Sequence, residues 1–363
     1  MRIALLVLLM PVHVALAQAT QPAAERETAL SDIVQLTSGF ARAGEAYFSP
    51  DMKWIIFQAS VERDGHYQMF LAEPQWAGDR IVGMDRPVQI GPANSRNTCG
   101  YFSPDGKRLM FASTVGKEKP DEPAGGYKRE GRNYTWSFPT GMEIYVAEWP
   151  HALPDSRVVN LSLKPLTDND VYDAECAFSP DGKWICFTRG AGKDADIFVM
   201  RADGSNPVKI VDAAGYDGGP FFSPDGKRLV YRSDRKGNDL LQIFVADLAL
   251  DDAGNITGMK AERQLTNDNN VNWGPYWHPG GKHIVYATSA HGHQNYELYL
   301  MRDDGTQPTR ITYKDGADVL PTFSPDGKWL MWTSKRTADG TTQVFAARFK
   351  LDPTPSPSGK GPG

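Results

Sequence analysis

The chain has 363 residues, of which 40% are apolar and 23% charged, and its formal net charge is −5. This is the composition of a folded globular protein and excludes a disordered or coiled-coil chain. The acidic balance argues against a nucleic-acid partner, and three cysteines are too few for a disulfide-stapled scaffold.

Residues 1–17 have the pattern of a secretory signal peptide. Arg2 precedes an apolar run that ends in Ala15-Leu16-Ala17. The alternative, a membrane anchor, needs about 20 apolar residues, and this run is shorter. We therefore expect cleavage near Ala17, a linker over 18–30, and a periplasmic or secreted protein without a transmembrane segment.

A hexapeptide of the form Phe-Ser-Pro-Asp-Gly-Lys recurs along the chain. Its copies stand at 48–53, 102–107, 178–183, 222–227 and 323–328, with a weaker one at 277–282. Pro presets the second position of a turn, and Gly supplies the positive φ that returns the chain as a strand. Each copy therefore predicts a β-hairpin, with a strained turn in the first copy, where Met52 replaces Gly.

Apolar residues keep a fixed spacing around every copy of the hexapeptide. An aromatic stands nine residues after the leading aromatic, an aliphatic stands twelve before it, and a further aromatic lies downstream. This spacing predicts four short strands per unit. Six such antiparallel units make an all-β fold, a six-bladed β-propeller.

The two ends of the chain predict how the ring closes. The last unit ends at 345–349 without an outer strand, and 32–37 is a spare strand ahead of the first unit. We expect this N-terminal strand to complete the last blade, so that the propeller covers 31–350 and 351–363 is a Pro/Gly-rich disordered tail. An open solenoid is the alternative, but its apolar ends would need caps.

Polar residues occur on the links between units, on the face opposite the hexapeptide turns. Five residues before the leading aromatic they are Asn97, Asp173, Asp217, Asn272 and Asp318, and two positions further on stand Glu45 and Glu175. One interpretation is a ring at the channel mouth that binds a ligand or holds a cation through oxygen atoms. The other is that these side chains cap their own turns.

The second unit carries an insertion over 114–141. It is rich in aromatic and basic residues, Tyr134 and Trp136 among them. Such residues dominate binding hot spots, which favours a partner surface. A lid that covers apolar blade edges explains them equally well.

The fifth unit carries His291-Gly292-His293 in a loop on the same face. Two imidazoles at this spacing suit a transition metal or acid–base chemistry. An exposed polar loop is the simpler interpretation. The cysteines, Cys99, Cys176 and Cys186, are expected to be buried free thiols rather than a disulfide, because the last two should point to opposite faces of one hairpin.

The repeat resembles the TolB-type propeller repeat, also called the WD40-like or PD40 repeat. The likeness rests on the hexapeptide and on segments such as 196–204 and 297–305, and it spans roughly 30–350. It implies a propeller of the bacterial envelope whose channel takes protein or peptide partners of the Tol–Pal kind. TolB proteins carry an α/β domain ahead of the propeller, whereas the first expected strand here begins at Asp32. Some propellers of this general kind are instead polysaccharide lyases that use channel histidines and a metal.

These observations leave three functional hypotheses. The first is a monomeric module of the cell envelope that binds a protein or peptide at its upper face, with no cofactor beyond a possible cation in the central channel. The second is an enzyme acting on carbohydrate, with Glu45, Glu175, His291 and His293 as acid–base or metal groups. The third is a structural envelope component without a discrete ligand.

Overall fold

The computed structural model describes residues 27–63, 65–92, 94–117, 126–130, 133–149, 152, 158–192 and 194–351, with the backbone alone over 126–130 and 133–137. The predicted signal peptide, most of the predicted linker and the tail from residue 352 lie outside these ranges. The described residues form 28 β-strands and no helix.

Six four-stranded antiparallel sheets form the blades, as the repeat predicted. In order from the innermost strand outward, blade 1 is β2 (Arg42–Phe48), β3 (Ile55–Ser60), β4 (Gln68–Ala72) and β7 (Val88–Gln89); blade 2 is β8 (Asn97–Phe102), β9 (Arg108–Ser113), β12 (Glu143–Glu148) and β13 (Lys164–Pro165); blade 3 is β14 (Tyr172–Phe178), β15 (Trp184–Ala191), β16 (Asp194–Arg201) and β17 (Val208–Val211). Blade 4 is β18 (Asp217–Phe222), β19 (Arg228–Ser233), β20 (Gln242–Leu250) and β21 (Ile256–Gln264); blade 5 is β22 (Asn272–Trp277), β23 (His283–Thr288), β24 (Glu297–Arg302) and β25 (Thr309–Arg310); blade 6 is β26 (Asp318–Phe323), β27 (Trp329–Ser334), β28 (Gln343–Phe349) and β1 (Leu30–Gln35).

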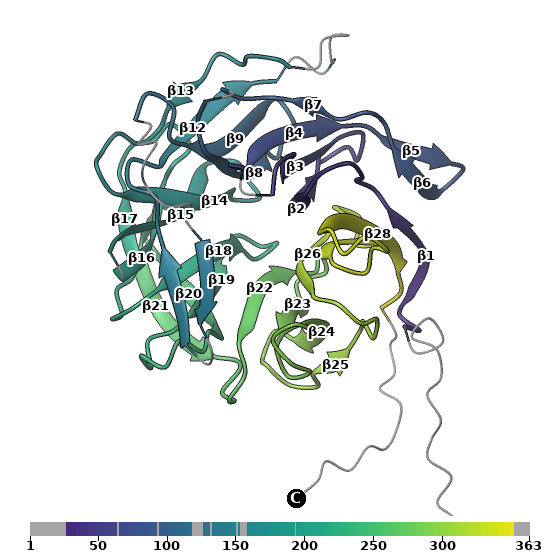
Figure 1. The fold of residues 1–363 in the computed structure, drawn as a ribbon. Coiled ribbons are helices and arrows are strands. Elements are labelled where there is room, and N and C mark those ends of the chain that lie inside the picture. The colour runs from purple at the N-terminus through teal and green to yellow at the C-terminus, as the bar shows by residue number, and fades with distance from the viewer. Residues whose placement is uncertain are drawn as a thin grey trace, which may run out of the picture.

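The blades are arranged radially around a central channel. Figure 1 shows the first strands of the blades, such as β2, β22 and β26, nearest the centre of the wheel. The hexapeptide turns all connect the first and second strands of a blade, so they lie together on one face, called here the lower face.

The hexapeptide turn is held by its own side chains. In the first copy Ser49 Oγ donates to Asp51 Oδ1 at 2.7 Å, and Trp54 N donates to Ser49 Oγ at 2.9 Å. Equivalent Ser–Asp bonds recur in blades 2, 3, 4 and 6. Met52 adopts a left-handed φ of 58°, which confirms the strained turn expected where Gly is missing.

The N-terminal strand closes the ring, as predicted. β1 pairs with β28 from Leu30 opposite Phe349 to Gln35 opposite Phe345. Figure 1 shows the purple first strand beside the yellow last strand. Thr37 Oγ1 extends the pairing by donating to Gln343 Oε1 at 2.7 Å.

A second contact also joins the first blade to the last. The hairpin of β5 (Pro74–Ala77) and β6 (Arg80–Met84) carries Trp76, which packs edge-on against Trp329 with ring centroids 5.9 Å apart. Arg348 at the end of β28 pairs with Asp79 in the turn of this hairpin at 2.7 Å. The long connection in blade 1 therefore helps to close the ring.

The core lies between neighbouring blades. One cluster brings Cys186 and Val199 of blade 3 against Phe222 and Tyr231 of blade 4. All three cysteines are buried free thiols, as expected. Burial raises the pKa of each thiol, because it disfavours the thiolate.

Candidate functional site

Every innermost strand carries a β-bulge at the same place. Positions are counted back from the leading aromatic, which is the Phe or Trp that begins each hexapeptide. In each strand the pairing register shifts between the fourth and the first residue before it, as between Ala174 and Ala177 of β14. The residue three before the leading aromatic has a left-handed φ in each blade. These residues are Glu45 (50°), Cys99 (56°), Glu175 (53°), Gly219 (60°), Gly274 (58°) and Leu320 (51°).

The six bulge residues form a ring around a cavity of about 370 Å³ in the upper half of the channel. Two of the six are glycines, which adopt a positive φ without strain, whereas the other four store backbone strain. Such strain is concentrated at functional sites. We name this space the upper cavity.

An aromatic cluster forms the floor of the upper cavity. Tyr47, Tyr101, Phe221 and Tyr276 pack together, with centroids 4.9 Å apart for Tyr47 and Tyr101 and for Phe221 and Tyr276. The hydroxyls of Tyr101 and Tyr276 are 3.1 Å apart. These rings separate the upper cavity from a lower one of about 300 Å³, lined by the prolines of the hexapeptide turns. The upper cavity is therefore closed at its inner end.

Glu175 and Arg232 form a buried ion pair in the cavity wall. Arg232 Nη2 lies 3.1 Å from Glu175 Oε1 and donates to Tyr216 Oη at 2.7 Å. Glu175 also accepts from Thr188 Oγ1 and from the amide of Gly219. A Cβ on Gly219 would lie 2.1 Å from Arg232 Nη1, so only glycine leaves room for the guanidinium. This pair is a fixed part of the wall.

Glu45 faces the same cavity with fewer partners. Burial raises the pKa of Glu45 to about 7, and the nearby charge of Glu175 adds to the effect, while a hydrogen bond from Cys99 and the charge of Arg232 oppose it. The carboxyl therefore changes charge near neutral pH.

Basic and aromatic side chains line the outer part of the cavity over blades 1 and 2. Arg42 lies over the ring of Tyr67, 4.4 Å from its centroid, and donates to the carbonyl of Gly65 at 2.6 Å. Arg96 and His66 line the cavity nearby. Burial, together with the charges of Arg96 and Arg42, lowers the pKa of His66, so this ring is neutral at pH 7.

The polar residues that stand five positions before each leading aromatic have protein partners, and the three aspartates among them pair within their own blades. Asp173 pairs with Arg189, Asp217 with Arg235 and Asp318 with Arg336. The amide nitrogens of Asn97 and Asn272 donate to Gln68 Oε1 and to Asp268 Oδ1, respectively. All five are buried, and of them only Asn97 lines the upper cavity.

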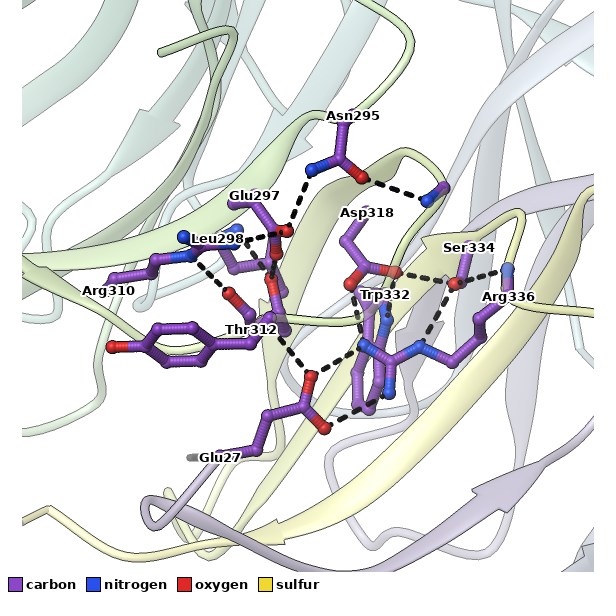
Figure 2. A network of polar contacts seen from close by, with 12 residues as sticks. Glu27, Asn295, Glu297, Leu298, Arg310, Thr312, Asp318, Trp332, Ser334 and Arg336 are labelled. Atoms are coloured by element: carbon purple, nitrogen blue, oxygen red, sulfur yellow. Dashed lines mark hydrogen bonds and ion pairs between the residues drawn. The ribbon is translucent and has the colours of Figure 1, made fainter. Parts of the chain in front are cut away.

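Figure 2 shows the network around Asp318 in blade 6. Trp332 Nε1 and Ser334 Oγ donate to Asp318 Oδ1, and Arg336 Nη2 donates to Oδ2 at 2.6 Å. Arg336 also contacts Glu27, which lies ahead of β1 in the range expected to be linker. Burial raises the pKa of Asp318, and the charge of Arg336 opposes this rise.

The histidine loop of blade 5 lies away from the upper cavity. His291 Nε2 is 2.8 Å from Tyr299 Oη, and its Nδ1 is 3.2 Å from Arg310 Nη1. Neither His291 nor His293 lines the cavity. In the parts of the chain that the structure describes, no three His, Cys, Asp or Glu residues are grouped so as to hold a metal ion.

The insertion in blade 2 reaches the cavity at its C-terminal end. Phe138, Pro139 and Met142 line the upper cavity, and Phe138 stacks on Tyr216 with centroids 5.5 Å apart. The insertion includes the hairpin of β10 (Gly126–Glu130) and β11 (Asn133–Ser137). The side chains of Tyr134 and Trp136 lie outside the described part of the chain.

The sequence missed the ring of bulge residues as a set. Only Glu45 and Glu175 were singled out, whereas Cys99, Gly219, Gly274 and Leu320 occupy the same position in other blades. The glycines in two blades, at a position otherwise taken by larger residues, were the available signal of a special backbone conformation.

Fold and cavity define the protein as a six-bladed β-propeller with a central pocket closed at its inner end. The family model described as "PD40: TolB beta propeller domain" matches residues 162–264 and 254–352, more than half of the chain. The chain therefore belongs to the TolB β-propeller family.

Curated relatives match part of the chain. A "Protein TolB homolog" of Chlorobium luteolum is 30% identical over 165 residues, which are 45% of this chain and 34% of the relative. A "Tol-Pal system protein TolB" of Francisella tularensis subsp. holarctica is 24% identical over 51% of this chain and 39% of the relative. "Dipeptidyl-peptidase 5" of Porphyromonas gingivalis is 27% identical over 53% of this chain and 31% of the relative. The chain spans about a third of the length of these relatives.

Solved structures share the fold. A putative TolB from Agrobacterium tumefaciens has a TM-score of 0.54 and 19% identity, over 85% of this chain and 91% of that one. An oligogalacturonate lyase in complex with manganese has a TM-score of 0.50 and 16% identity, over 88% of this chain and 91% of that one. Among the described residues no helix has the length and apolar character needed to cross a membrane.

Proposed function

We propose that this protein is an exported, monomeric β-propeller of the bacterial cell envelope that binds a protein or peptide partner in its upper cavity. The signal-peptide pattern at 1–17 supports export. A relative that carries the name of the Tol–Pal system supports an envelope role.

The observation that carries the proposal is the upper cavity itself. It collects the bulge residues of all six blades, four of them strained, and its walls combine aromatic surface with a few charged groups. Binding pockets have this mixture of apolar walls and few polar groups, and volumes from roughly 300 to 1,000 Å³. The insertion of blade 2 adds Phe138 and Pro139 to the wall, so it is the second element that we expect to contact the partner.

Capture from the envelope tests the proposal. The tagged protein, incubated with detergent-solubilised envelope proteins, is expected to retain a defined partner. Leu320→Trp should narrow the cavity without changing its charge, because Leu320 lines the cavity and already has the left-handed φ. Val82→Trp, at an exposed position of β6, is the matched control.

Loss of the partner with Leu320→Trp and its retention with Val82→Trp support the proposal. Equal capture by both variants, each with a wild-type melting temperature, would contradict it.

A carbohydrate-acting enzyme is the second candidate, and one observation favours it. Glu45 has a pKa of about 7, a value suited to general acid–base catalysis. The two histidines named for this hypothesis do not line the cavity with Glu45. Incubation with uronate oligomers, with and without manganese, tests the candidate: turnover that Glu45→Gln abolishes would favour it over binding alone.

A further inference from the structure

We propose that the upper cavity recognises the free C-terminal carboxylate of the partner chain, which enters end-on from the upper face. This inference rests on the proposed function and adds the chemistry by which the cavity selects its ligand.

The charge of the lining favours an anion. Arg42, Arg96 and Arg232 line the cavity together with two carboxyl groups, Glu45 and Glu175. Glu175 is already paired with Arg232 and accepts hydrogen bonds from neighbouring groups. The lining is thus positive in a chain whose net charge is −5.

Two buried donors in the lining have no acceptor. Arg232 Nε is buried without a hydrogen-bond partner on a side chain that is only 8% exposed. Arg42 Nε is also buried without a partner, although Arg42 as a whole is partly exposed. A buried unpaired N–H group costs free energy, which an incoming acceptor recovers. The described residues of this cavity include no buried side-chain oxygen without a partner. The described lining therefore offers the guanidinium groups of three arginines and no unpaired buried acceptor, which favours a ligand rich in acceptors, such as a carboxylate.

The shape of the cavity favours a chain end. The rings of Tyr47, Tyr101, Phe221 and Tyr276 close it at the inner end, so an extended chain cannot pass through the propeller. An end that carries its own negative charge fits a closed, positive cavity better than the middle of a chain does.

Glu45 couples this binding to pH. Charged and titratable groups from five elements line the upper cavity together with Glu45. They are Arg42 and Tyr47 on β2, His66 and Tyr67 in the β3–β4 loop, Arg96 and Cys99 at β8, Tyr172 and Glu175 on β14, and Arg232 on β19. An incoming carboxylate is repelled by ionised Glu45 and accepted by the neutral acid. Binding should therefore take up a proton at Glu45 and weaken as the pH rises through about 7.

Titration calorimetry with matched peptides tests this inference. The probes are N-acetylated tripeptides without internal acidic residues, varied at the last position and prepared as free carboxylates and as C-terminal amides. We expect the carboxylates to bind at least about tenfold more tightly than the amides. Their affinity should fall by about tenfold between about pH 6 and about pH 8, because one proton is taken up on binding.

Three variants separate the contributions. Glu45→Gln should keep the affinity seen at low pH and lose the pH dependence. His66→Asn should keep the dependence, because the lowered pKa of His66 leaves that ring neutral over most of the range. Arg42→Met should weaken carboxylate binding about tenfold and leave amide binding unchanged.

Equal affinity for carboxylates and amides would overturn the inference. An affinity that rises with pH and is lost in Glu45→Gln would also overturn it, because this result would indicate that the cavity prefers a cationic ligand. Binding of a uronate trimer in place of the peptides would also overturn it and favour the second candidate function. Envelope capture tests the proposed function separately, since a partner held by an internal segment would still be lost in Leu320→Trp.

Discussion

Arg336 and Glu27, which are 309 positions apart in the chain, form an ion pair at 3.1 Å. Both side chains are at least nine-tenths buried. Glu27 also accepts from the amide of Tyr313 at 2.8 Å, so it joins the N-terminal segment to blades 5 and 6. The ring is thus closed by charged contacts as well as by the pairing of β1 with β28.

Glu27→Gln should lower the free energy of unfolding by about 1–3 kcal/mol, because it removes the charge that Arg336 and the Tyr313 amide contact in a buried setting. Urea unfolding measures the change. Glu73→Gln, at an exposed position, is the control and should stay within about 0.5 kcal/mol of the wild type. Equal stability of the two variants would show that Glu27 does not hold the ring together.

Phe222→Ala should cost about 3–5 kcal/mol, since Phe222 packs between blades 3 and 4 in a tight core. Val82→Ala, at a position 49% exposed, should have almost no effect. The same urea titrations measure both. A loss under about 1 kcal/mol for Phe222→Ala would mean that the repeated aromatics do not carry the packing between blades.

Glu45 should make stability depend on pH. Its pKa of about 7 in the folded state lies above the usual value of 4.5, so the folded protein binds the proton more tightly than the unfolded chain does. The contribution of protonated Glu45 to the free energy of unfolding is complete below pH 4.5 and is lost as the pH rises through about 7. Glu45→Gln should therefore be more stable than the wild type by about 1–3 kcal/mol at about pH 8 and equal to it near pH 4.5. Thermal unfolding across this range decides the matter; parallel pH curves for both proteins would contradict the raised pKa.

The thiols should be unreactive in the folded protein. Cys99, Cys176 and Cys186 are buried, and burial raises the pKa of each, so little thiolate is present. Mass spectrometry after iodoacetamide treatment at about pH 8 should find no modified cysteine in native buffer and three in guanidinium. Rapid modification of the native protein at Cys99 would indicate that the upper cavity exposes this thiol.

The repeat in the sequence predicted six blades and the strand that closes them, because turn chemistry and strand alternation are local properties. It did not predict the contact of Glu27 with Arg336 or the packing of Trp76 on Trp329, since both join segments with no fixed spacing. These two contacts can be recognised only when the first and last blades are placed side by side in the folded structure.

The bulges explain why the candidate site was predicted only in part. Strand alternation placed Asp173 on the same face as Glu175, in the channel. In β14 two residues, Glu175 and Cys176, lie opposite one residue of β15, so the alternation reverses there. Glu175 then lines the upper cavity, whereas Asp173 turns to Arg189 within the blade. Such a one-residue shift leaves no periodic signal in the sequence.

Hydrogen exchange of the protein with and without its captured partner tests the central claim most directly. If the partner occupies the upper cavity, protection should be concentrated in peptides that cover the bulges, among them 42–47, 96–99, 172–176 and 320–322. The hexapeptide turns of the lower face should exchange at the same rate in both samples. Protection confined to those turns or to the outer strands of the blades would contradict a partner site in the upper cavity.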